Sequence, residues 1–172
     1  MKKFNEIALG IIAPLFIAVL IYLFYRNSNL VIFKCVDLLN LLPQIKILQT
    51  EIQNLLPLPS WAIYSLPGAL WLLSSMNLLL WLWEFNINFK SITWIITPFI
   101  FAILLEFLQY LHFTDGRFDW IDLLFYSITA LLFFVGSIVK RKEESSERSM
   151  HWQALTLCTM MILIVYGADK MG

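Results

Sequence analysis

Residues 92–139, ITWIITPFIFAILLEFLQYLHFTDGRFDWIDLLFYSITALLFFVGSIV, contain two long apolar runs on either side of a short polar loop. The first run, Ile92–Leu111, carries Glu106 as its only acidic or basic residue, and the second, Trp120–Val139, carries only Asp122. A helix needs roughly 20 apolar residues to cross the hydrocarbon core of a bilayer. The two runs therefore predict a pair of transmembrane helices joined by a short connection.

The same length rule predicts three further spans outside this pair, at Ile7–Tyr25, Trp61–Trp83 and Trp152–Ala168. Hydrophobic residues make up 60% of the chain and charged residues 14%, whereas about a quarter of a soluble domain is charged. We therefore predict an all-α fold, a single polytopic transmembrane helix bundle of about five spans over residues 1–172. The first apolar run is expected to be an uncleaved span, because it is longer than the apolar region of a typical signal peptide.

The connection between the first two predicted spans is long and unusually apolar. Residues 30–58 combine apolar stretches with interspersed glutamines and a few charged residues, a pattern typical of helices that lie in the plane of the membrane interface. Proline interrupts helices, so this segment should be divided into pieces at Pro43, Pro57 and Pro59. The sequence thus predicts interfacial helices between the first and second spans.

The lysines and arginines indicate an orientation for the bundle. The cluster Lys140, Arg141 and Lys142 follows the fourth predicted span directly, and Lys90 lies at the same predicted membrane face. Basic residues close to span ends favour the cytoplasmic side. The sequence therefore predicts an N-terminus inside the cell and, with five spans, a C-terminus outside.

Composition and spacing argue against several other classes of partner. The 12 basic and 12 acidic residues balance, so no basic surface is expected to bind nucleic acid. Cys35 and Cys158 are too few for a structural zinc site. Asp115, Asp119 and Asp122 lack the spacing of a calcium loop. We predict neither a metal nor another cofactor.

Glu106 is the first candidate for a functional residue, because an ionisable side chain inside a membrane is costly and is commonly functional. Gln109 and Tyr110 follow it at i+3 and i+4 and so lie on the same side of the predicted helix. Two interpretations stay open at this stage. Glu106 belongs either to a ligand-binding site or to a protonated or paired group that holds helices together.

The start of the fourth span supplies more polar residues. Asp119 has the position of a helix N-cap, a structural role, with Asp122 three residues later. Asp122, Tyr126 and Thr129 follow Asp119 at i+3, i+7 and i+10 and form one polar stripe on an otherwise apolar helix. This stripe predicts a polar contact between the fourth span and its neighbours.

The second span contributes polar residues at a similar depth. Ser65, Pro67 and Gly68 are expected near the level of Glu106 and Tyr126, counted by helical rise. Further along the same span, a second polar seam toward neighbouring helices is predicted at i, i+3 and i+7, by Ser74, Asn77 and Trp81.

Together these residues resemble a known family. Glu106-x-x-Gln109, followed by a short loop and by Gly116-Arg117-Phe118-Asp119-x-x-Asp122 at the start of the next span, is similar to the signature of the VanZ-like bacterial membrane proteins. Leu66-Pro67-x-x-Leu70-Trp71 resembles a proline and tryptophan pattern of the same group. The resemblance covers residues 61–139. It implies a location in the bacterial cytoplasmic (inner) membrane and a role in the cell envelope, without implying a reaction.

The chain departs from the family pattern at two places. Tyr126 stands near the position where many relatives have asparagine. Residues 130–136 contain one glycine where relatives have a Gly-x-x-x-Gly run. These departures put in doubt the polar function of that position and the close packing around it.

The leading functional hypothesis is a site in the outer leaflet that binds a lipid or a lipid-linked envelope molecule. Its predicted ligand-binding residues are Glu106, Gln109, Arg117, Asp119, Asp122 and Tyr126. Glu106 would accept a hydrogen bond from a hydroxyl, amine or amide, and Arg117 would meet a phosphate or carboxylate. The alternative interpretation of Arg117 is an interfacial arginine that only extends its charge to water.

Three other classes of function are weighed against this hypothesis. The chain could be an accessory subunit of a larger membrane complex, with other membrane proteins as partners. It could be an enzyme that uses Glu106 and Asp122 as a paired acid and base on lipid headgroups. No nucleophile stands beside a base, so no catalytic residue is assigned. A transporter is less favoured, because about five spans without an inverted repeat suit alternating access poorly.

Overall fold

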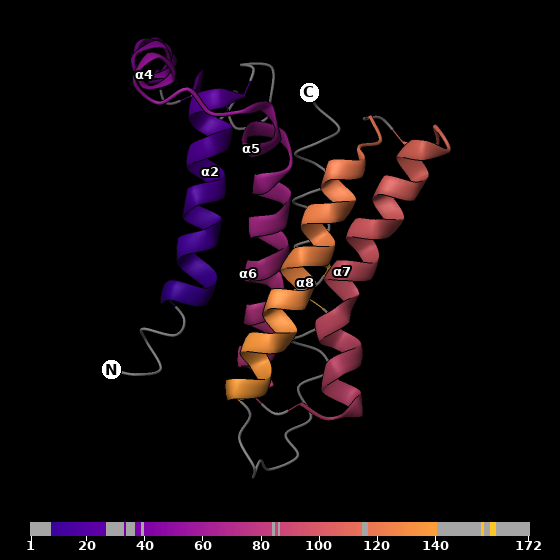
Figure 1. The fold of residues 1–172 in the computed structure, drawn as a ribbon. Helices are drawn as coiled ribbons and strands as arrows, with labels where there is room; N and C mark the ends of the chain where they lie inside the picture. The colour runs from indigo at the N-terminus through magenta and orange to yellow at the C-terminus, as the bar shows by residue number, and fades with distance from the viewer. Residues whose placement is uncertain are drawn as a thin grey trace.

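Six α-helices and one π-helical turn form the described part of the chain, which confirms the all-α class (Figure 1). The computed structural model describes residues 8–26, 33, 37–38, 40–83, 85, 87–114, 117–140, 156 and 159–160. The helices are η1 (Ala8–Ile12), α2 (Ala13–Tyr25), α4 (Leu42–Leu55), α5 (Ser60–Tyr64), α6 (Leu66–Leu82), α7 (Phe89–Tyr110) and α8 (Trp120–Lys140).

Two of these helices are long and apolar enough to cross a membrane, namely Phe89–Tyr110 and the Trp120–Ser137 part of α8. They correspond to the third and fourth predicted spans. The apolar helices Leu9–Tyr25 and Leu66–Leu82, in the first and second predicted spans, are shorter. The fifth predicted span, residues 152–168, lies outside the described residues except for Thr156, Thr159 and Met160.

Proline determines where the second predicted span is broken. α5 ends at Tyr64 and α6 begins at Leu66, with Pro67 buried in the first turn of α6. Proline has no N–H to donate to the preceding turn, so it is tolerated at a helix start and breaks a helix interior. In the same way Pro43 lies in the first turn of α4, and Pro57 and Pro59 separate α4 from α5.

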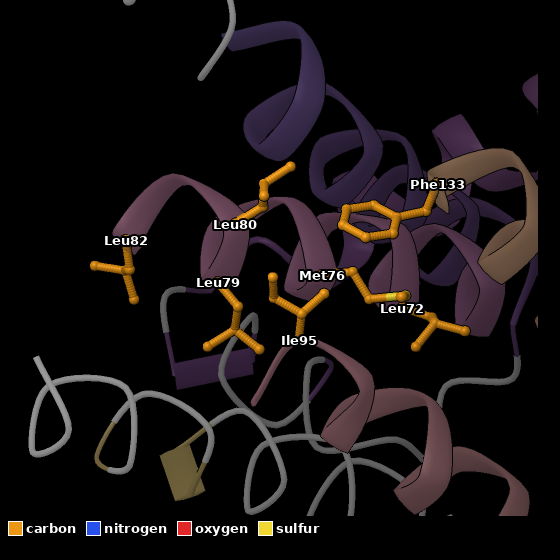
Figure 2. Packing of buried hydrophobic residues seen from close by; sticks show 7 residues of the cluster. All are labelled: Leu72, Met76, Leu79, Leu80, Leu82, Ile95 and Phe133. Carbon is orange, nitrogen blue, oxygen red and sulfur yellow. The ribbon is translucent and has the colours of Figure 1, made fainter. Parts of the chain in front are cut away.

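α6 is the central helix of the bundle and packs against α2, α7 and α8. Figure 2 shows the largest apolar cluster at this contact. Most of its buried side chains come from α6, and α7 and α8 add one each: Leu72, Met76, Leu79, Leu80, Leu82, Ile95 and Phe133. α6 therefore holds the other helices in place around it.

The polar seam predicted on α6 forms against the π-helical turn. The Ser74 hydroxyl donates a buried hydrogen bond to the carbonyl oxygen of Ile11, at 2.8 Å. The Asn77 side chain lies against Gly10, 3.6 Å from where a Cβ would stand. Trp81, predicted to share this seam, is exposed instead. The seam fixes α6 against the first helix through Ser74 and Asn77.

α4 lies beside the end of α2, where Figure 1 shows it end-on while the other long helices run from one end of the bundle to the other. Gln49 Nε2 donates to the carbonyl oxygens of Leu23 and Arg26, at 3.0 and 3.2 Å. Gln53 Nε2 donates to that of Phe24, at 2.7 Å. The last carbonyls of a helix have no partner within it, so α4 caps the end of α2.

Candidate functional site

The end of α7 is closed by a left-handed turn that directs the chain back toward α8. His112 has a positive φ of 62°. Its N–H donates to Gln109 O at 3.0 Å, and the N–H of Phe113 donates to Leu108 O at 2.9 Å. This pair of bonds is the Schellman motif, which ends a helix and satisfies its last carbonyls. α7 therefore stops four residues after Glu106, close to the start of α8.

Asp119 caps α8, as the sequence predicts. Its Oδ1 accepts a hydrogen bond from the N–H of Ile121 at 2.9 Å, and its carbonyl oxygen accepts one from the N–H of Asp122 at 3.2 Å. Asp122 follows in the first turn of α8 and is half-buried. Both carboxylates lie where the partial positive charge of the helix N-terminus stabilises them.

Glu106 is buried, with 5% of its surface exposed, and its carboxylate reaches the start of α8. Its Oε2 accepts a hydrogen bond from the backbone N–H of Asp119 at 3.4 Å. Through this contact Glu106 joins the third predicted span to the start of the fourth. The first amides of a helix lack partners within the helix, so they are suitable donors to a buried carboxylate.

Tyr126 approaches α6 from α8 at a glycine. A Cβ added to Gly68 would lie 2.8 Å from the Tyr126 hydroxyl oxygen and 3.2 Å from a ring carbon. Distances below 3.0 Å do not occur for real Cβ atoms, so only glycine permits this contact without a shift. Gly68 and Tyr126 therefore lie at the same level of the bundle, as the sequence predicts, and they also contact each other.

Trp61, Ser65 and Gly68 lie on one face of α5 and α6, because they are spaced i, i+4 and i+7 and Ser65 keeps a helical backbone. Both outer members of this set contact α8. The Trp61 ring stacks on Phe125, with ring centroids 5.6 Å apart, and Gly68 meets Tyr126. Ser65, between them, is 2% exposed, and its hydroxyl has no hydrogen-bond partner. By this spacing Ser65 lies on the helix face that carries the two contacts with α8.

We use the name junction site for Ser65, Glu106, Asp119, Asp122 and Tyr126, where α5, α6, α7 and α8 meet. Gln109 is half-buried on α7, one turn beyond Glu106, and Arg117 is exposed, two residues before Asp119. The structure joins Glu106 to Asp119 and Tyr126 to Gly68 through two separate contacts. Asp115 and Gly116, in the loop between the third and fourth predicted spans, lie outside the described residues.

Aromatic contacts at this end of the bundle are a feature that the sequence analysis did not predict. Phe118 packs edge-on against Tyr110 and against Trp120, with centroid distances of 5.3 and 4.9 Å. Arg26 lies over the rings of Tyr22 and Tyr64, at 4.8 and 4.9 Å. The sequence shows that aromatic residues lie near the ends of the predicted spans. Which of them pair depends on how the helices are rotated relative to one another.

The described residues include no group of three or more His, Cys, Asp or Glu side chains that could hold a metal ion. The junction site itself supplies three carboxyl groups and two hydroxyl groups, those of Ser65 and Tyr126. No family model, curated protein or solved structure matches the chain. The resemblance to the VanZ-like proteins consequently stays a prediction.

Replacing Gly68 with alanine is expected to lower the free energy of unfolding by about 1–3 kcal/mol, because the added methyl group overpacks against Tyr126. The double variant Gly68→Ala/Tyr126→Phe should recover part of this loss, since it removes the closest atom. Thermal unfolding in mild detergent measures both effects.

Gly136→Ala is the matched control, because nothing lies within 4 Å of its added Cβ. It should be neutral or slightly stabilising, since alanine favours a helix more than glycine does. Strictly additive losses in the Gly68→Ala/Tyr126→Phe double variant would show that the hydroxyl does not limit the space at Gly68.

Proposed function

We propose that the chain is a multi-pass protein of the bacterial cytoplasmic membrane whose junction site binds a lipid or a lipid-linked envelope molecule. The observation that carries this proposal is the buried carboxylate of Glu106 at the start of α8. An ionisable group at this depth in a membrane is costly to keep, which favours a function for it.

The surface of the two long helices supports a membrane location. Only 28% of the apolar window of α7 and 17% of that of α8 is buried within the bundle. The core helix of a soluble protein would be mostly buried, whereas here the apolar surface is left facing outward. The surrounding medium that suits this surface is the hydrocarbon of a bilayer.

The arrangement of the helix ends supports an interfacial role for α4. In Figure 1, α2 and α7 end, and α5 and α8 begin, at the end of the bundle where α4 lies. Leu41, Leu48 and Leu55 are exposed and recur every seven residues, so they form one apolar stripe beside the face that contacts α2. Such a stripe suits a helix lying at the lipid surface. The junction site then lies in the same leaflet as α4.

The roles of the junction residues follow from their positions. Glu106 would accept a hydrogen bond from the bound headgroup, with Gln109 and Tyr126 orienting it. Arg117 is exposed at the edge, where it would meet a phosphate or carboxylate. The resemblance to the VanZ-like proteins agrees with a ligand from the cell envelope.

The proposal is tested by mass spectrometry of the lipids retained by the protein purified in mild detergent. Glu106→Gln is expected to fold normally, because the amide oxygen of glutamine still accepts the Asp119 N–H, and to lose one retained class of lipid. Leu131→Ala, on an exposed apolar position of α8, is the control and should retain the same lipids as the natural chain.

Identical retention by the natural chain and Glu106→Gln would contradict the proposal. A stoichiometric protein partner in the same preparation would instead support the accessory-subunit alternative. If Glu106→Gln fails to accumulate while Leu131→Ala does, the buried carboxyl is a folding element.

A further inference from the structure

The junction site contains a hydroxyl group whose hydrogen-bonding capacity is unused. Ser65 Oγ is buried and has no hydrogen-bond partner, and Ser65 lies on the helix face between the Trp61–Phe125 stack and the Gly68–Tyr126 contact. Leaving such a group unsatisfied in a buried position costs free energy. The Thr114 Oγ1 atom, in the connection after α7, is also buried without a partner. The Ser65 hydroxyl is therefore available to a polar group of a ligand.

The charges of the junction site are ordered by depth. Glu106 is buried, Asp122 is half-buried and Asp119 is exposed, and all three carry carboxyl groups, while the guanidinium of Arg117 is exposed two residues before Asp119. A complementary ligand has a cationic hydrogen-bond donor that reaches inward and an anionic group that stays at the edge. A purely anionic headgroup is a poorer match, because it would bring negative charge toward the carboxyl groups of Glu106 and Asp122.

We infer that the junction site binds the headgroup of an aminophospholipid, with its primary ammonium group at Glu106 and Ser65 and its phosphate at Arg117. This inference rests on the proposed function and specifies its ligand class. A primary ammonium has three N–H donors, which suits a buried carboxylate oxygen together with a serine hydroxyl. The phosphate next to it in the headgroup suits the planar fork of an arginine.

A lipid with a trimethylated ammonium shows whether the site recognises the N–H donors of the ligand or only its positive charge. Phosphatidylcholine has the same charges as phosphatidylethanolamine, but its nitrogen carries no N–H donor. A hydrogen bond to a charged group is worth enough to change an affinity by about tenfold or more. The inference therefore requires the primary amine to be preferred over the choline headgroup as well as over the anionic phosphatidylglycerol.

The experiment uses the full chain in nanodiscs that contain equal amounts of phosphatidylethanolamine, phosphatidylcholine and phosphatidylglycerol with matched acyl chains. Native mass spectrometry after release into detergent counts the lipids that remain bound. The natural chain is expected to retain phosphatidylethanolamine over each of the others by about tenfold. Glu106→Gln should bring the ratios close to one, and Ser65→Ala should lower them in part.

Arg117→Gln should weaken retention of all three lipids by a similar factor, because all three carry the phosphate. Leu131→Ala should leave every ratio unchanged. Soluble glycerophosphoethanolamine, added in excess, should fail to displace the lipid. Displacement by it at a comparable affinity would overturn the lipid assignment in favour of a soluble headgroup.

The outcomes separate this inference from the proposed function. Preferential retention of phosphatidylglycerol, or equal retention of the ethanolamine and choline lipids, overturns the aminophospholipid assignment while Glu106-dependent retention still supports a lipid site. Absence of any retained lipid that depends on Glu106 or Ser65 overturns both. If Glu106→Gln fails to fold, the headgroup ratios of the natural chain and of Ser65→Ala decide the inference.

Discussion

Replacing Met76 with alanine is expected to lower the free energy of unfolding by about 2–5 kcal/mol, the range found for large-to-small substitutions in packed cores. Met76 is fully buried on α6, in the cluster that also contains Ile95 of α7 and Phe133 of α8 (Figure 2). Three helices meet around this side chain, so they cannot all move inward to fill the space that it leaves. Unfolding in mixed detergent and sodium dodecyl sulfate measures the loss.

In a bilayer the loss of packing contacts is the main part of the Met76→Ala effect, so the lower end of this range is expected. A bilayer or detergent micelle is as apolar as the core, so packing dominates the contact between membrane helices. Leu131→Ala removes more than a methyl group from an exposed position and should change the free energy of unfolding by less than about 0.5 kcal/mol. Equal losses for the two variants would show that α6 is not the packing centre of the bundle.

The long apolar helices α7 and α8 could be predicted from the sequence. The length of an apolar run can be counted without knowing what it packs against. α7 shows the limit of this rule, since it begins at Phe89 and not at the predicted Ile92. Asn88 Oδ1 accepts the N–H of Ser91, and Ser91 Oγ accepts the N–H of Asn88, each at 2.8 Å. This capping box starts the helix before the apolar run, so that the charged Lys90 lies in the first turn of α7.

The position of α4 was only partly predictable. Its apolar pattern indicated an interfacial helix, and Pro43 marks its start. The bonds from Gln49 and Gln53 to the end of α2 cross more than 20 residues of sequence. Glutamine on an amphipathic helix usually faces water, so no local pattern distinguishes these two from solvated residues.

The junction site was predictable where its residues are close in sequence. Glu106 and Asp119 are only 13 residues apart, near the end of one predicted span and at the start of the next, so the sequence places them at the same end of the bundle. The unused hydroxyl of Ser65 and the stack of Trp61 on Phe125 depend on the rotation of α5 and α6 relative to α8. That rotation results from the packing of whole helices, which one sequence does not reveal.

The prediction with the clearest outcome concerns which side of the membrane each end of the bundle faces. α4 lies at one end, and α7 begins at the other (Figure 1). Asn54 on α4 and Lys90 on α7 are both exposed, so a cysteine at either position should react readily. The parent chain has Cys35 and Cys158 replaced by serine, and a membrane-impermeant maleimide is added to right-side-out vesicles.

Asn54→Cys is expected to be labelled almost completely and Lys90→Cys hardly at all until the vesicles are permeabilised. The physical reason is that Lys90 shares its end of the bundle with Lys140, which starts the basic cluster Lys140, Arg141 and Lys142. Basic residues so close to a helix end are retained in the cytoplasm. Inside-out vesicles should give the opposite pattern and serve as the control.

A reversed pattern in both kinds of vesicle would place α4 and the junction site at the cytoplasmic leaflet. The contacts of Glu106, Ser65 and Asp119 would be unchanged, because they are internal to the bundle. The proposed ligand would then have to be a lipid of the inner leaflet. A lipid-linked envelope molecule that has already been exported would not reach the site. Labelling of both cysteines from one side would be a stronger contradiction, since α7 would then not cross the membrane.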